Sequence, residues 1–259
     1  MNRAYELVIL GTGNVAHHLS KAFYDQGCTI KQVYSKTQAN ADHLAKAVNA
    51  YPVSEIKALY SKADFYLMAL KDDAIPEFAE QISLSNALIA HTSGSWGLDA
   101  LTNATQRAGV FYPLQTFSKD KAIEMREVPI FIEANEQGDL VQLRQLAKLL
   151  TPAVYEIDSQ VRTYLHLSAV IANNFSNHLW YLAKEELKKA NLPYEILQPL
   201  LQETLAKSME QGPYHAQTGP AKRGDESIVK KHLEFIEDPE VRELYHKLSK
   251  SISGTYLKE

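Results

Sequence analysis

Short apolar runs alternate with amphipathic stretches over the first 157 residues of the chain. The apolar runs are bounded by turn residues, which is typical of the buried strands of a parallel sheet. We expect strands at residues 6–10, 29–34, 64–70, 87–90, 109–112, 128–132 and 153–157, with a weaker strand near 50–51. We expect helices at residues 14–26, 38–48, 98–103 and 137–150, with a short helix that ends near residue 60. This alternation predicts an α/β fold with a mostly parallel, doubly wound sheet.

The pattern changes after Asp158. Residues 159–191 contain no turn signal and have mixed polarity, which predicts one long helix. Further helices are expected at residues 193–211, 226–235 and 239–251, with a loop of helix breakers at 212–225. The chain therefore has an α/β domain of residues 1–157 and an all-helical domain of residues 158–259, and its 259 residues suit two domains.

A glycine turn joins the first expected strand to the first helix in the pattern Gly-x-Gly-x-x-Ala. Gly11 permits the tight turn, Gly13 lets a pyrophosphate approach the backbone, and Ala16 lets the helix pack closely on the strand. The pyrophosphate would bind the free N–H groups at the positive end of the helix. A plain turn is the alternative, but this one follows a strand and opens a helix, which favours a dinucleotide site. The residues expected there are Gly11, Thr12, Gly13, Asn14 and Val15.

The end of the second expected strand indicates which dinucleotide binds. Domains that prefer NAD place an acidic residue here to hold the ribose 2′-hydroxyl. This chain has Tyr34, Ser35 and Lys36 instead, a hydroxyl and a cation that suit a 2′-phosphate. The alternative is an ordinary loop with a solvated lysine. The sequence therefore favours NADP as the cofactor.

Two later loops also follow buried strands, at the edge of the sheet where ligands bind in open α/β folds. Ala69, Leu70, Lys71 and Asp72 could line the cofactor, although a solvated turn with a capping aspartate is an alternative. The loop that contains Thr92 and Ser93 could face the nicotinamide and the substrate, although it could instead cap the helix near residues 98–103.

The long helix carries an unusual group of polar residues. His166, Val170, Asn173 and Asn177 are spaced by four, three and four residues, which would place them on one face of an α-helix. Histidine exchanges protons near neutral pH, and asparagine can both donate and accept hydrogen bonds. The alternative is a set of polar residues that bind this helix to the sheet or to a second subunit. We take His166 as a candidate proton donor or acceptor and Asn173 as a substrate-orienting residue.

The loop at residues 217–225 is a further candidate. Two glycine–proline bends, Gly212-Pro213 before it and Gly219-Pro220 within it, could order Lys222 and Arg223 to present a cation to a phosphate or carboxylate. The alternative is a surface connection in which Asp225 caps the next helix. We take Arg223 as a candidate anion-binding residue.

Composition limits the remaining function classes. The net charge of -4 gives no reason to expect a nucleic acid or an anionic membrane as partner. The single cysteine, Cys28, excludes an internal disulfide and a cysteine metal cluster, and we expect no bound metal. It also fits a reducing compartment. Without a signal peptide or a long apolar run, we expect a cytoplasmic protein.

Five motifs occur together in this order: the glycine turn, residues 91–94, 112–117, 166–174 and 218–225. In this combination the chain resembles, over essentially its whole length, a bacterial family of Rossmann-like NADP oxidoreductases whose helical C-terminal domain has no known function. Wider relatives would be pyrroline-5-carboxylate reductases, β-hydroxyacid dehydrogenases of the 6-phosphogluconate dehydrogenase type and deazaflavin-dependent NADP reductases. The resemblance implies a homodimer formed by the helical domain, with an active site completed between the domains.

One departure from these relatives concerns the catalytic group. In β-hydroxyacid dehydrogenases a lysine stands three residues before an Asn-Asn pair, whereas Val170 stands there before Asn173 and Asn174. His166, one turn earlier, is the available substitute. We expect an NADP-dependent oxidoreductase that transfers a hydride between the nicotinamide and a small C=O or C=N substrate bound between the domains. The alternatives are an NADP-binding sensor or assembly protein without turnover, or a site for a different nucleotide.

Overall fold

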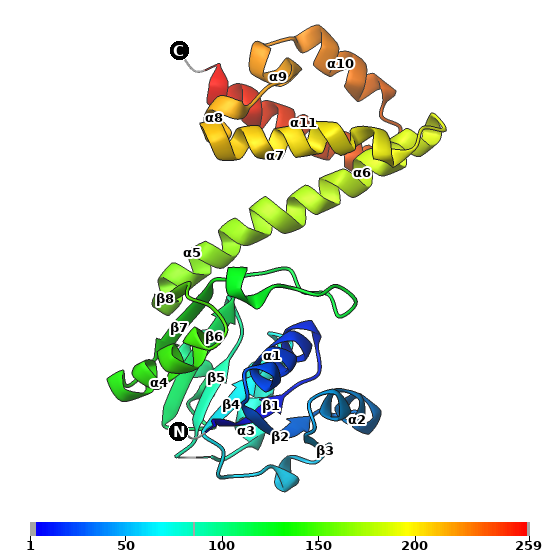
Figure 1. Cartoon of the computed structure of the whole chain (residues 1–259). Coiled ribbons are helices and arrows are strands. Elements are labelled where there is room, and N and C mark those ends of the chain that lie inside the picture. Colours follow the sequence, from blue (N-terminus) through cyan, green and yellow to red (C-terminus); the bar gives the residue numbers. More distant parts are fainter. Residues whose placement is uncertain (1–3, 85, 258–259) are drawn as a thin grey trace. The chain divides into compact units, whose positions relative to one another are not determined.

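The computed structural model of the chain describes residues 4–84 and 86–257 (Figure 1). Within these residues the chain divides into two compact units, Met1–Val170 and Ile171–Glu259. The division lies beyond the expected one at residues 157 and 158. Helix α5 (Ser159–Ala169) belongs to the first unit because its first turns bind Glu133 of the sheet.

An eight-stranded sheet forms the centre of the first unit, in the strand order β3-β2-β1-β4-β5-β6-β7-β8. The strands are β1 (Glu6–Leu10), β2 (Thr29–Tyr34), β3 (Tyr51–Val53), β4 (Phe65–Met68), β5 (Leu88–His91), β6 (Arg107–Pro113), β7 (Ile130–Ala134) and β8 (Val154–Glu156). All neighbours are parallel except β6 and β7. This confirms the mostly parallel, doubly wound sheet. The strand order reverses between β1 and β4, which is where such sheets bind their ligands.

Helices cover both faces of this sheet (Figure 1). They are α1 (Asn14–Asp25), α2 (Gln38–Ala47), α3 (Ala74–Gln81) and α4 (Gln137–Lys148), with the short 3-10 helices η1 (Ile56–Ala58), η2 (Leu98–Leu101) and η3 (Met125–Glu127). Side chains of α1, α2 and α4 pack on one face, and side chains of α3 and η2 pack on the other.

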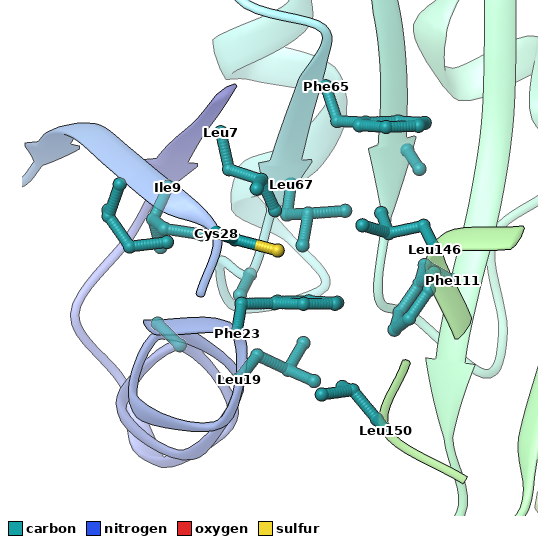
Figure 2. Packing of buried hydrophobic residues seen from close by; sticks show 14 of the residues in the cluster. Leu7, Ile9, Leu19, Phe23, Cys28, Phe65, Leu67, Phe111, Leu146 and Leu150 are labelled. Atoms are coloured by element: carbon teal, nitrogen blue, oxygen red, sulfur yellow. The ribbon is translucent and has the colours of Figure 1, made fainter. Parts of the chain in front are cut away.

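The core explains why the central strands read as unbroken apolar runs. Along β1, Leu7 and Ile9 belong to one apolar cluster, and Val8 and Leu10 belong to the other. Successive side chains of a strand point to opposite faces, so a strand buried on both sides has no polar position. Figure 2 shows the first cluster, in which Cys28 packs among the aliphatic and aromatic side chains. Burial raises the pKa of the Cys28 thiol to about 11, so it packs as a small apolar residue.

The second unit is built from helices. They are α6 (Ser176–Lys189), η5 (Tyr194–Leu197), α7 (Gln198–Gln211), α8 (Pro213–Ala216), α9 (Pro220–Arg223), α10 (Glu226–Phe235) and α11 (Pro239–Tyr256). This confirms the all-helical C-terminal region. Residues 212–225, which were expected to form a loop, contain the two short helices α8 and α9. Each of them begins with a proline, whose fixed φ suits the first turn of a helix.

The expected single helix at residues 159–191 is also interrupted. Between α5 and α6, residues Val170–Phe175 form a π-helix, which contains Asn173 and Asn174. A π-helix takes more residues per turn than an α-helix, so the spacing of four, three and four no longer places the chosen residues on one face. Among the described residues, no helix has the length and apolar character needed to cross a lipid bilayer.

Candidate functional site

The turn between β1 and α1 requires glycine at its first position. Gly11 has a φ of 120°, and a methyl group in place of its hydrogen would lie 2.3 Å from the carbonyl oxygen of Ala69. Its N–H donates to the carbonyl of Tyr34 at 2.9 Å, which joins the ends of β1 and β2. Gly13 is the N-cap of α1, has open space where a side chain would be, and provides no capping side chain. The first N–H groups of α1 are therefore available to an anion.

A pocket of about 550 Å³ opens beside this turn. Its lining contains the expected cofactor residues Gly11, Thr12, Gly13, Asn14, Val15, Tyr34, Ser35, Lys36, Ala69, Leu70 and Lys71. Three expected residues, Asp72, Thr92 and Ser93, do not line it. Ala74 and Phe78 of α3 line it and were not expected, because an apolar wall supplied by a helix carries no sequence signal distinct from the core.

The rim of this pocket carries the groups expected at a 2′-phosphate. Ser35 is nearly buried, and its hydroxyl accepts hydrogen bonds from Thr12 Oγ1 and the Thr37 N–H, both at 3.3 Å. The Lys36 ammonium is exposed and lies 3.6 Å from a carboxylate oxygen of Glu77 on α3. Lys36 therefore lies beside the pocket, within ion-pair distance of Glu77.

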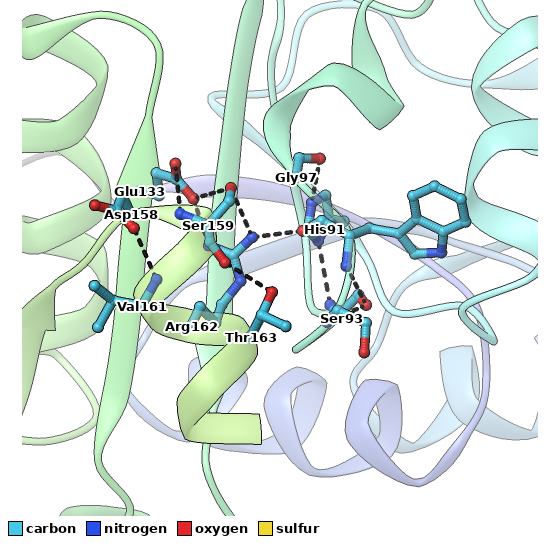
Figure 3. Close-up of polar contacts among 11 residues, drawn as sticks. His91, Ser93, Gly97, Glu133, Asp158, Ser159, Val161, Arg162 and Thr163 are labelled. Carbon is cyan, nitrogen blue, oxygen red and sulfur yellow. Dashed lines mark hydrogen bonds and ion pairs between the residues drawn. The ribbon is translucent and has the colours of Figure 1, made fainter. Parts of the chain in front are cut away.

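The loop after β5 is shaped by a buried histidine. His91 is completely buried, its Nδ1 accepts the Ser93 N–H at 3.2 Å, and its Nε2 donates to the Gly97 carbonyl at 3.1 Å (Figure 3). Burial lowers the pKa of His91 to about 4, so the imidazole stays neutral. The Ser93 hydroxyl accepts the N–H groups of Ser95 and Trp96. The loop does not cap the next helix as one interpretation proposed, because the N-cap of η2 is Gly97 and has no side-chain bond.

The loops after β4 and β5 are joined by a tryptophan. Trp96 Nε1 donates to the carbonyl of Asp72 at 2.8 Å. At the other expected cap, the residue before α3 is Asp73, and its carboxylate makes no capping bond. Asp72 therefore contacts the β5 loop through its backbone carbonyl.

A buried arginine attaches α5 to these loops (Figure 3). The Arg162 side chain is 1% exposed, forms an ion pair with Glu133 of β7, and donates to the carbonyl of Trp96. Glu133 also accepts the N–H of Ser159 at 3.1 Å and its hydroxyl at 2.7 Å. A buried charge is stable only when it is paired and hydrogen-bonded, so this network fixes the position of α5 against the β5 loop.

One turn after Arg162 on α5, His166 packs against the loop after β5. Its Nδ1 lies 3.0 Å from the hydroxyl of Tyr112, at the carboxyl end of β6. The imidazole also lies directly against Gly94, where a methyl group would be 2.5 Å from Nδ1. Tyr112 is nearly buried, and burial followed by the charge of Asp72 raises the pKa of its phenol. The phenol is therefore protonated at neutral pH.

Two expected site residues lie in the second unit. Asn173 is exposed within the π-helix, and Arg223 at the end of α9 binds Asp225, with 2.7 Å between Nη2 and Oδ2. Asp225 precedes α10 but makes no capping bond, so the capping interpretation is wrong. Their roles towards a substrate stay predictions.

The sequence reasoning missed Tyr112, Trp96 and Arg162 as site residues. Tyr112 had a usable signal, because it ends a buried strand at the edge where the other candidates lie. Trp96 and Arg162 had none, because their hydrogen bonds join positions that only the tertiary fold brings together.

Comparison with known proteins agrees with this arrangement. Residues 6–92 match the family described as NADP oxidoreductase, coenzyme F420-dependent, and residues 128–252 match the domain of unknown function DUF2520. No curated protein matches the chain. A presumed NADP oxidoreductase of Bacteroides fragilis is 40% identical, with a TM-score of 0.91 over 97% of this chain and 98% of that one.

Two more distant structures share the fold. A Thermotoga maritima protein is 21% identical, with a TM-score of 0.77 over 96% of this chain and 99% of that chain. An imine reductase of Myxococcus stipitatus in complex with NADP+ is 15% identical, with a TM-score of 0.65 over 98% of this chain and 100% of that chain. Because the Bacteroides fragilis protein is similar over nearly its whole length, this chain belongs to its family, the NADP oxidoreductases in which a Rossmann-like domain precedes a DUF2520 domain.

Proposed function

We propose that this protein transfers a hydride between NADP and a small C=O or C=N substrate, and that His166 handles the proton. The observation that supports this most is the shared sheet edge. The glycine-turn pocket lies at the carboxyl ends of β1, β2 and β4, and the Tyr112–His166 pair lies beyond those of β5 and β6. Groups that follow parallel strands lie at one edge, where open α/β sheets bind their ligands.

The residues of the pocket fit NADP. The close approach at Gly11 and the uncapped start of α1 suit a pyrophosphate, because a side chain at either glycine would fill that space. Ser35 and Lys36 supply a hydroxyl and a cation for a 2′-phosphate. The backbone of residues 69–72 would lie along the cofactor, and Thr92 and Ser93 would be close to the nicotinamide.

The protein's own part in the reaction is to place the substrate and move a proton. Bound NADP would supply or accept the hydride at its nicotinamide ring. In the direction of reduction, His166 Nε2 would pass its proton to the substrate oxygen or nitrogen as negative charge develops there, while Nδ1 takes the proton of the Tyr112 hydroxyl, which would regain one from water. Asn173 would orient the substrate, and Arg223 would bind an anionic group. The lone, buried Cys28 fits a reducing cytoplasm.

Titration with NADPH and NADH, followed by nicotinamide fluorescence, tests the cofactor. We expect tight NADPH binding and weak NADH binding, and Lys36→Ala should reduce the difference. Glu77→Gln removes the carboxylate beside Lys36 and should tighten NADPH binding by about 1.4- to fivefold, because exposed pairs contribute about 0.2–1 kcal/mol. Equal binding of both nucleotides would contradict the 2′-phosphate site, and binding of neither would contradict a dinucleotide site.

Oxidation of NADPH in the presence of aldehydes, keto acids and cyclic imines tests turnover. His166→Ala should bind NADPH normally and lose most of the turnover. Full turnover of this variant would remove His166 from the role. NADPH binding without oxidation by any compound of the panel would favour a sensor or assembly protein.

We also propose that the helical unit forms a homodimer. Among the described residues, α6, α7, α10 and α11 contain no buried side chain. Large apolar side chains of these helices are exposed, including Met209 at 78% and Phe235 at 81%. Contiguous apolar surfaces are rare on monomeric proteins, and a second copy of the chain would cover these side chains.

A further inference from the structure

We propose that Tyr112 is a positioning residue that fixes the tautomer of His166, so that the neutral imidazole carries its proton on Nε2 and presents a hydrogen-bond donor to the substrate. The catalytic meaning of this inference rests on the proposed function. The tautomer itself is a property of the protein without cofactor or substrate.

The two side chains meet through one hydrogen bond whose polarity decides the tautomer. Tyr112 Oη and His166 Nδ1 are 3.0 Å apart, and either atom could be the donor. If the phenol donates, Nδ1 is unprotonated and the proton of the neutral ring is on Nε2. If Nδ1–H donates, Nε2 carries no proton and can only accept a hydrogen bond.

Chemistry favours the phenol as the donor. A phenol O–H is a better donor than a neutral imidazole N–H, and an imidazole nitrogen is a better acceptor than a phenol oxygen. Burial, together with the charge of Asp72, keeps the phenol protonated, while Arg162 acts in the opposite direction but is already paired with Glu133. The other nearby ring, His91, is neutral and uses both its nitrogens within its own loop.

The surroundings hold the imidazole in this orientation. Gly94 lies against Nδ1 and Cγ of His166, and the Tyr112 ring meets the imidazole edge-on with 6.0 Å between the ring centres. The Tyr112 ring also packs near Phe131 of β7. Rotation of either ring would break the hydrogen bond, so packing on two sides maintains this contact.

The opposite nitrogen is open. Among residues 4–84 and 86–257, no hydrogen bond involves His166 Nε2, and the side-chain polar atom that is buried without a partner is Arg162 Nε. Nε2 is therefore accessible to solvent. A neutral imidazole fixed in this way offers an N–H donor to a substrate oxygen or nitrogen.

Nuclear magnetic resonance of the ring nitrogens in ¹⁵N-labelled full-length protein tests the assignment directly. The signals of His166 are identified by their loss in His166→Gln. At a pH where the ring is neutral, we expect Nε2 to be protonated and Nδ1 to be bare in the wild type. Tyr112→Phe keeps the ring but removes the hydroxyl, and should shift His166 towards a mixture of both tautomers.

Tyr155→Phe is the matched control, because Tyr155 stacks on the same Phe131 and does not bond His166. It should leave the His166 signals unchanged. A wild-type ring protonated on Nδ1, or an unchanged pattern in Tyr112→Phe, would overturn the proposal. Because this readout needs neither NADP nor a substrate, its outcome is independent of the test of hydride transfer.

A second readout connects the tautomer to activity. In Tyr112→Phe the neutral ring would carry the Nε2 proton in only part of the molecules. Once a substrate is found, kcat of this variant should be lower than kcat of the wild type, while the KM for NADPH is unchanged. Equal kcat values for the two proteins would overturn the functional part of the inference.

Discussion

At the scale of single residues, the site depends on two glycines that permit close approach. Gly11 lets the first turn pass the Ala69 carbonyl, and Gly94 lets His166 lie against the β5 loop. The role of Gly11 follows from its motif. The role of Gly94 does not, because its partner is 72 positions further along the chain and only packing reveals the contact.

Replacing Gly94 with alanine tests this contact. The added methyl would lie 2.5 Å from His166 Nδ1 and would displace the imidazole from Tyr112. We expect a loss of stability of about 1–3 kcal/mol from overpacking and a fall in turnover of about 100-fold from misplacement of the ring. NADPH affinity should be retained. Gly138→Ala adds a methyl into open space and should change neither turnover nor affinity.

At the scale of elements, the loop after β5 depends on His91 being neutral. The buried ring connects Ser93 and Gly97 and so determines the path of the loop that contacts Arg162 through Trp96. The sequence predicted a loop with a ligand-binding or capping role at this position. It did not predict that the buried His91 side chain forms hydrogen bonds to two backbone groups of this loop.

The decrease in stability at acidic pH should show that His91 is neutral in the folded protein. The folded-state pKa of His91 is about 4, below its usual 6.5, so the unfolded state binds more protons between these values. The contribution of His91 to the free energy of unfolding is therefore fully present above pH 6.5. It decreases by about 3 kcal/mol as the pH falls to about 4.

Urea unfolding at several pH values measures this effect. His91→Gln keeps a donor for the Gly97 carbonyl and has no proton to bind, so its stability should fall less between pH 6.5 and 4 than that of the wild type. His43→Gln, at an exposed position of α2, should retain the wild-type slope. An identical slope for His91→Gln would show that His91 is not the titrating group.

At the scale of the whole molecule, the two units differ in how they bury apolar surface. The sheet of the first unit has an apolar cluster on each face, whereas the buried apolar residues of the second unit are Ala221 and Ile236 within its described part. Hydrophobic burial is the main favourable contribution to folding, so we propose that the second unit gains stability from further contacts.

Sedimentation velocity tests whether a second copy provides those contacts. We expect a dimer, and Leu200→Glu on α7 should shift it towards monomer, because the charge would be buried in the interface. Tyr51→Glu, at a 74% exposed position of the first unit, should leave the dimer intact. A wild-type protein that stays monomeric at all concentrations would contradict the homodimer.

The sequence by itself determined the local features of this protein. The bounds of β1, β2 and α10, the parallel sheet and the glycine turn all follow from periodicity and turn chemistry, which act between neighbouring residues. Most of the residues that line the pocket beside the glycine turn could also be predicted, because parallel strands bring their carboxyl ends to one edge. The tertiary structure decided the rest. Tens of residues separate Tyr112 from His166, and Arg162 from Glu133, along the chain. Hydrogen bonds and close packing between residues so far apart produce no periodic pattern in the sequence.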